Sequence, residues 1–372
     1  RIGSAAGLGN QIAGNSQDGI HFCVNDTATT AIYANLVGLN AARTQAVPNA
    51  WSGVALFWGP KLTNLGGAAT LGNTISGNGQ VGIYVAGTGT NQNLVRGNRI
   101  SSKPLPLGVR GDGLRLWYSH KNRIEENQVI DSRDMVVWYS NGNLFKDNLG
   151  RRSRYSIHFM FANDNEVVGN RFYDNAVGVY LMYTEGVNVR NNVISHATGA
   201  TGMGLGFKEA SAAVIEGNEI IYCAVGVHSD LSPFQPGTTI EFRNNRIAYN
   251  GIGMLFTSEL GGNVADGNVF EGNLTHVAQA GRNTNSLNQW RGNHWDDYQG
   301  FDRDGDNVGD TPYELYAFAD RIWMEIPQAR FFKTSPALEL LDFLERLAPF
   351  SSPDLMLKDE APRFRKQERK AS

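Results

Sequence analysis

An asparagine recurs along most of this chain at a spacing of a little over twenty residues. Each one follows a small or polar residue and precedes a hydrophobic segment, and the intervals between them are 29, 21, 22, 22, 26, 27, 23 and 25 residues. A structural unit of about 22 residues therefore repeats, with loop insertions of varying length, and such a period predicts a stacked solenoid. The positions are Asn98, Asn127, Asn148, Asn170, Asn192, Asn218, Asn245, Asn268 and Asn293.

The repeat unit consists of short segments, as in residues 155–161, 166–170 and 171–173. Each segment is too short for a helix and alternates apolar with polar residues, which is typical of half-buried strands. A coil of this length has room for about three strands and none for a crossover helix. We therefore expect an all-β fold, a right-handed single-stranded parallel β-helix, in which stacked asparagines hydrogen-bond from coil to coil.

Composition excludes two classes of function. A net charge of -3 with 19% charged residues argues against a nucleic-acid-binding protein, which would carry a basic stripe. Apolar runs stay well short of the length that spans a bilayer, so the chain is not expected to span a membrane.

Cys23 and Cys223 lie too far apart to form a metal-binding motif. The chain opens at Arg1 with no apolar leader, so its residues alone do not indicate a compartment.

The chain divides into five zones. Residues 1–98 predict irregular Gly- and Asn-rich β-helix coils, and 99–292 predict regular coils that carry the site. Residues 293–331 break the repeat and are expected to form a C-terminal cap with an acidic loop. Residues 332–348 predict one short amphipathic α-helix, with Ser335 and Pro336 at its start and leucines at helical spacing. Residues 349–372 predict an extended or disordered tail.

Counting back from the closing asparagine of four consecutive coils predicts which strand residues face outward. Thirteen and eleven residues before it, every coil has an apolar residue, so these two columns are expected to face the interior. Alternation then places the columns at twelve and ten residues on the outer face. The outward residues are Arg115, Val136, His158 and Tyr180 in one column, and Trp117, Trp138, Met160 and Met182 in the other.

The outer row predicts a soft metal site. His158, Met160 and Met182 would lie within reach of one ion, because neighbouring coils are about 4.8 Å apart. Two thioethers and an imidazole suit Cu(I) and suit Mg²⁺ or Ca²⁺ poorly. Trp138 could stack over the cation. Trp117, His228 and Met254 are accessory candidates. A covered hydrophobic patch or a partner interface would also explain such a row.

An acidic loop predicts a second, harder metal site. Residues 302–310 place carboxylates at relative positions 1, 3, 5 and 9 of a Gly-containing loop, with a backbone carbonyl available from Val308. Oxygen ligands at alternate positions are what Ca²⁺ requires, although the glycine is not where an EF-hand has it and no glutamate closes the loop. We expect a structural Ca²⁺ held by Asp302, Asp304, Asp306, Val308 and Asp310.

Taken together, these motifs resemble the NosD family of nitrous-oxide-reductase maturation proteins over about residues 99–350. The resemblance rests on the acidic loop and on several short segments that follow the family's order, whereas residues 1–98 are more similar to generic coils of secreted β-helix proteins. The matching segments are 110–117, 155–164, 177–182, 292–295, 301–313, 320–323 and 335–338.

The resemblance implies a periplasmic accessory protein that binds Cu(I) transiently and is not an enzyme. It implies association with the ABC transporter NosF/NosY, receipt of copper from NosL, and delivery toward the nitrous oxide reductase NosZ. Carried over residue by residue, His158, Met160 and Met182 match the family's strand motifs. They coincide with the row found by counting.

The sequence is also compatible with two other functions. Parallel β-helices also host lyases, epimerases and hydrolases of acidic polysaccharides, which need clustered carboxylates or a basic residue on a strand face. The candidates for such a site are Asp112, Asp131, Asp134, Arg115 and Arg154. A structural or adhesive β-helix would explain the N-terminal zone but gives no reason for the outer row.

Overall fold

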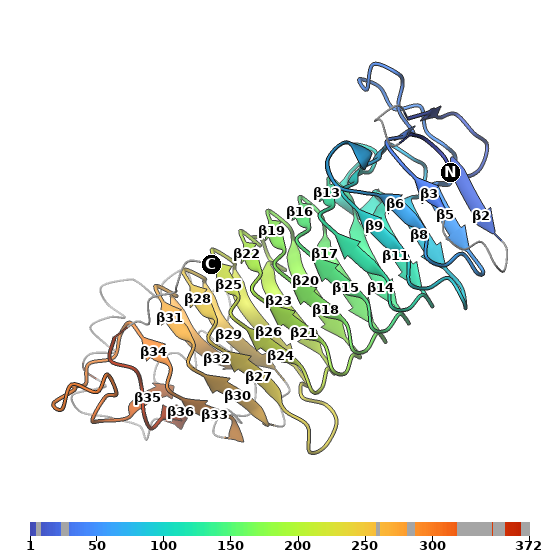
Figure 1. The fold of residues 1–372 in the computed structure, drawn as a ribbon. Helices are drawn as coiled ribbons and strands as arrows, with labels where there is room; N and C mark the ends of the chain where they lie inside the picture. The colour runs from blue at the N-terminus through green and yellow to red at the C-terminus, as the bar shows by residue number, and fades with distance from the viewer. Residues whose placement is uncertain are drawn as a thin grey trace.

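The chain winds into a right-handed parallel β-helix whose coils contribute one strand each to three long sheets (Figure 1). This computed structural model describes residues 1–4, 9–23, 30–257, 261–280, 287–317, 344 and 354–365. We name the three sheets A, B and C. The N-terminal coils lie at one end of the stack, and strands β35 and β36 lie at the other end (Figure 1).

Sheet C has the longest strands, mostly of five or six residues, and all its described pairs are parallel. Its strands in order are β2 (Ile20–Cys23), β5 (Ser52–Phe57), β8 (Val81–Ala86), β11 (Asp112–Trp117), β14 (Asp134–Trp138), β17 (Tyr155–Met160), β20 (Val177–Met182), β23 (Met203–Lys208), β26 (Val225–Asp230), β29 (Ile252–Thr257) and β32 (Thr275–Ala280).

Sheets A and B are built from strands of mostly three residues. Sheet B contains, in order, β1 (Gln11–Ile12), β4 (Leu36–Val37), β7 (Thr74–Ser76), β10 (Arg99–Ser101), β13 (Gln128–Ile130), β16 (Leu149–Arg151), β19 (Arg171–Tyr173), β22 (Val193–Ser195), β25 (Glu219–Ile221), β28 (Arg246–Ala248), β31 (Val269–Glu271) and β34 (His294–Trp295). Sheet A contains β3 (Ala31–Ile32), β6 (Asn64–Gly66), β9 (Leu94–Arg96), β12 (Arg123–Glu125), β15 (Leu144–Lys146), β18 (Glu166–Val168), β21 (Asn188–Arg190), β24 (Val214–Glu216), β27 (Ile240–Arg243), β30 (Asn263–Asp266), β33 (Gln289–Arg291), β36 (Asp354–Asp359) and β35 (Tyr313–Ala317).

The predicted asparagine ladder is confirmed, and it runs between sheets A and B. Asn148 donates its backbone and side-chain N–H groups to the side-chain oxygen of Asn170, at 2.8 and 2.9 Å, and Asn170 bonds to Asn192 in the same way. The second amide hydrogen of Asn170 reaches the carbonyl of Phe145, so buried polar groups of one coil are satisfied by its neighbours. Asn293 ends the ladder by donating to the carboxylate of Asp359 on β36.

The two inward columns of sheet C are buried as predicted. Ile157, Phe159, Val179 and Leu181 have no exposed surface and pack with side chains of sheets A and B. The coils of residues 30–98 pair in register with those that follow, since β8 pairs with β11 and β9 pairs with β12. The zone predicted as irregular coils therefore belongs to the same stack.

Two short 3₁₀ helices interrupt the coils, η1 (Ala69–Leu71) and η2 (Leu107–Val109). The α-helix expected over 332–348 falls almost wholly outside the described residues, and the cap expected over 293–331 is described only as far as 317. Across the described part of the chain, no helix has the length and apolar character needed to cross a bilayer.

The tail expected over 349–372 contains a paired strand. Strand β36 pairs antiparallel with β35 and meets β33 at Trp290 and Asp359, so sheet A continues beyond the last coil. The alternative of a disordered tail is therefore wrong for residues 354–359. The apolar run there explains the strand, because Met356 and Leu357 are buried.

Candidate functional site

Strand pairing in sheet C brings the predicted outer row together. Trp138 on β14 lies opposite Met160 on β17, and Met160 lies opposite Met182 on β20. Trp117 precedes Trp138 in the same row, with ring centroids 5.5 Å apart. The register obtained by counting from the asparagines is thus the register of the structure. Met160 and Met182 thus lie on adjacent coils, whose backbones are about 4.8 Å apart.

His158 faces outward, but it does not project into solvent as expected. Its side chain is only 8% exposed, because three aromatic rings surround it. Tyr155 stacks on the imidazole at 4.8 Å, while Trp138 and Tyr180 meet it edge-on at 5.9 and 6.0 Å. Tyr155 precedes His158 by three residues on β17, and its ring lies on the same face of the strand as the imidazole. Sequence counting alone did not reveal this aromatic enclosure.

Within the described part of the chain, the enclosed imidazole has no hydrogen-bond partner at either ring nitrogen. Burial lowers the pKa of His158 below its ordinary value, with Arg154 acting in the same direction and Asp134 opposing it. The ring is therefore neutral at physiological pH, and one of its nitrogens offers a free lone pair. Leaving a buried polar group unpaired costs about 1–3 kcal/mol, which a ligand at that nitrogen would offset.

Beside this enclosure, charged residues form a closed network. Asp112 is buried and accepts hydrogen bonds from Arg115 and Arg133, and buried Asp134 accepts from Arg154. These are the carboxylates considered above for a polysaccharide-acting enzyme. Both carboxylates are thus held in charge-assisted hydrogen bonds with arginines. The third carboxylate, Asp131, is paired with Arg152.

The two accessory candidates further along the stack, His228 and Met254, face opposite sides of sheet C. His228 on β26 shares the outward column of His158 and Tyr180. Met254, by contrast, lies opposite Val227, is 1% exposed and belongs to the core. The expectation that Met254 serves the site is therefore wrong. The loop insertion that follows His228 hid the register, and the structure places Leu255 next to His228.

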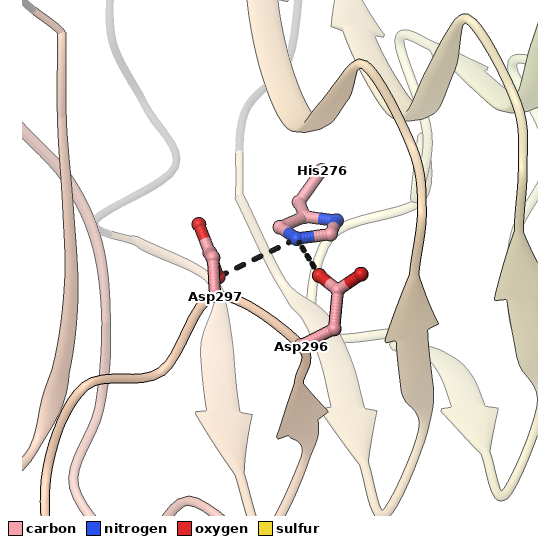
Figure 2. Close-up of side chains that lie close together, drawn as sticks. All are labelled: His276, Asp296 and Asp297. Atoms are coloured by element: carbon pink, nitrogen blue, oxygen red, sulfur yellow. Dashed lines mark ion pairs between the residues drawn. The ribbon is translucent and has the colours of Figure 1, made fainter.

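A second polar cluster lies at the end of sheet C, and sequence analysis missed it. His276 is 7% exposed, and its Nε2 lies 2.8 Å from Asp296 and 3.4 Å from Asp297 (Figure 2). The two carboxylates follow β34. The four preceding strands of sheet C have glycine at their second position, Gly178, Gly204, Gly226 and Gly253, where β32 has His276. This break in the glycine column was the signal available in the sequence.

The His276 cluster is satisfied as an ion pair. Burial lowers the imidazole pKa, but hydrogen bonds to Asp296 and Asp297 outweigh it and raise the pKa to about 9. The amide nitrogen of Asn273, 3.3 Å from Nδ1, favours the neutral ring, yet one long neutral contact is weaker than two charge-assisted ones. The cluster thus ties the last strand of sheet C to the segment after β34.

The acidic loop gathers three of the expected ligands. Carboxylate oxygens of Asp302, Asp304 and Asp306 lie within 4.8 Å of one another. The Asp310 carboxylate instead accepts the backbone N–H of Arg303 at 2.8 Å, and Val308 forms a bridge with Arg363. Backbone N–H groups already donate to all three gathered carboxylates.

Comparison with known proteins places the chain in a family. Residues 92–300, more than half of the chain, match the family described as "Periplasmic copper-binding protein (NosD)". Two similar proteins are named "Probable ABC transporter binding protein NosD". The one from Pseudomonas aeruginosa is 31% identical over 195 residues, which is 49% of this chain and 39% of that protein. The one from Stutzerimonas stutzeri is 36% identical over 112 residues, which is 30% of this chain and 25% of that protein.

The matched regions thus span less than half of either relative's length. Among solved structures, the mannuronan C-5 epimerase AlgE6 A-module from Azotobacter vinelandii has a TM-score of 0.47 at 15% identity, covering 76% of this chain and 88% of the other. An alginate lyase from Paenibacillus has a TM-score of 0.46 at 15% identity, covering 68% and 99%. Likenesses this distant do not bear on function. The family match does, and the chain belongs to the NosD family of periplasmic copper-binding proteins.

Proposed function

We propose that this chain is a periplasmic copper-handling accessory protein, without catalytic activity of its own, that binds Cu(I) transiently during the maturation of nitrous oxide reductase. The proposed ligands are His158, Met160 and Met182. The observation that carries the proposal is the enclosed imidazole of His158, because the ring is buried and neither of its nitrogens has a partner among the described residues.

The neighbouring donors match the chemistry of Cu(I). Met160 follows His158 by two residues on the same outer face, and Met182 is its partner on the next strand. Thioether and imidazole ligands favour Cu(I) over harder cations. The ring of Trp138 borders both His158 and the methionine row, where it can contribute a cation–π interaction and exclude water.

Family membership and the names of the relatives support an association with an ABC transporter. We propose association with an ABC transporter of the NosF/NosY type, receipt of copper from NosL, and passage toward NosZ. A site with two partly exposed thioethers is suited to transfer, because such soft ligands can be exchanged one at a time. A structural Ca²⁺ held by Asp302, Asp304 and Asp306 is a further part of the proposal.

A competition titration against a Cu(I) chelator tests the proposal. The wild-type chain should withhold Cu(I), and His158→Ala combined with Met160→Ala should weaken this site by on the order of 100-fold or more, since even outer-shell changes cost 10–100-fold at metal sites. His196→Gln, an exposed histidine outside sheet C, is the matched control. Unchanged affinity in the double variant, with an unchanged circular dichroism spectrum, would remove the site assignment.

A further inference from the structure

The tautomer of His228 is fixed by its neighbours. Its Nε2 lies 3.2 Å from the Thr257 hydroxyl oxygen, which lies 3.1 Å from the carboxylate of Asp230. A carboxylate can only accept, so Thr257 donates its hydroxyl hydrogen to Asp230 and its oxygen accepts from Nε2–H. The other nitrogen, Nδ1, then carries a lone pair.

This lone pair has no partner within the described structure. Nδ1 of His228 is buried and makes no hydrogen bond. The chain from Asp230 through Thr257 to the imidazole is the kind of outer-shell support that orients a histidine metal ligand and sets its tautomer. The arrangement is costly without a ligand, as at His158.

A sulfur atom lies on the adjacent coil. Gly206 on β23 is the neighbour of His228 in the outward column, and a Cβ built on Gly206 would stand 2.9 Å from the sulfur of Met203 and 2.3 Å from the ring of Tyr180. The thioether of Met203 therefore folds over this glycine. Neighbouring strands lie about 4.8 Å apart and Gly206 pairs with His228, so we infer that the flexible side chain of Met203 can reach the His228 ring.

Soft donors thus occupy four consecutive strands of one face. His158 and Met160 stand on β17, Met182 on β20, Met203 on β23 and His228 on β26. Each of these strands pairs with the next. His158 and His228 are three coils apart, about 14 Å at the backbone, which is too far to share one ion.

We propose that Met203 and His228 form a second Cu(I) site on the outer face of sheet C, separate from the His158 site and one coil beyond Met182. This inference rests on the proposed copper function and extends it. Two sites in line would let copper enter at one and leave from the other without a change in the stiff scaffold between them.

Counting bound copper tests the second site. The probe is Cu(I) supplied from a chelator of known affinity, with Ag(I) as a redox-inert surrogate, and the readouts are stoichiometry and affinity. We expect two equivalents for the wild-type chain and one for Met203→Leu combined with His228→Gln. We also expect one equivalent for His158→Ala with Met160→Ala, and none when all four changes are combined. Met254→Leu, a core methionine, is the matched control.

The outcomes separate the two proposals. One outcome is that the wild-type chain binds only one equivalent. If His158→Ala with Met160→Ala removes that equivalent and Met203→Leu with His228→Gln keeps it, the second site is overturned and the proposed function stands. No binding by the wild-type chain would overturn both. One equivalent that is lost only with Met203 and His228 would support the second site and remove the first.

Thr257 provides a more specific test, because it acts on the metal only through His228. Thr257→Val should keep two equivalents but weaken the second site about 10–100-fold. Imidazole ¹⁵N shifts of His228 in the metal-free chain should show that the Nε2–H tautomer is no longer preferred. Thr257→Ser restores the hydroxyl and should restore both readouts. An unaltered tautomer and affinity in Thr257→Val would contradict the assignment of Nδ1 as ligand.

Discussion

At the scale of single residues, the site is a compromise between stability and binding. His158 is enclosed by Tyr155, Trp138 and Tyr180 and leaves two polar atoms unpaired. His158→Phe keeps an aromatic ring at this position and removes both unpaired ring nitrogens. We therefore expect the metal-free chain to gain on the order of 1 kcal/mol in unfolding free energy and to lose the copper site. Urea unfolding without metal measures the gain, and a loss above about 2 kcal/mol would show that the imidazole is satisfied.

The same residue predicts a pH dependence. Burial holds the pKa of His158 below its ordinary value, so the unfolded chain takes up a proton at a higher pH than the folded chain does. Its contribution to stability is therefore full above the unfolded pKa of about 6.5 and is lost as pH falls below it. Melting temperatures at pH 7.5 and 5 should differ less in His158→Phe than in the wild type, and an equal difference would contradict this.

At the scale of strands and ladders, the His276 cluster fastens β32 to the segment after β34. The folded pKa of about 9 exceeds the unfolded value of about 6.5, so this contribution is full below pH 6.5 and is lost as pH rises through 9. The difference corresponds to roughly 3 kcal/mol. His276→Gln should abolish the loss of stability between pH 6.5 and 9.5, measured by hydrogen exchange in β32. A persisting loss in the variant would assign it to other groups.

The asparagine ladder makes a second prediction at this scale. Asn170→Ala removes the acceptor for two donors of Asn148 and the donor for the Phe145 carbonyl, all buried. We expect a loss of about 3–5 kcal/mol in unfolding free energy, since each unsatisfied group costs about 1–3 kcal/mol. Gln128→Ala, an exposed change two coils away, should stay within about 0.5 kcal/mol. Similar values for the two variants would contradict a structural role for the ladder.

For the molecule as a whole, the features that recur in every coil could be predicted from the sequence. The features that depend on insertions or on contacts between different coils could not. The asparagine period gave the β-helix and the outward register of Met160 and Met182, because stacking fixes pairing coil by coil. Met254 was misplaced because an insertion hides the register. The aromatic enclosure of His158 and the His276 cluster both join residues from different coils, so neither follows from the period.

The proposed function depends most on one Cu(I) being held by one imidazole and two thioethers on sheet C. Copper-edge X-ray absorption of the Met203→Leu, His228→Gln chain, loaded with one equivalent of Cu(I), isolates that site. We predict a first shell of mixed sulfur and nitrogen whose sulfur component disappears when Met160 and Met182 are also changed to leucine. A shell of nitrogen and oxygen alone, or one that survives those changes unaltered, would contradict the account.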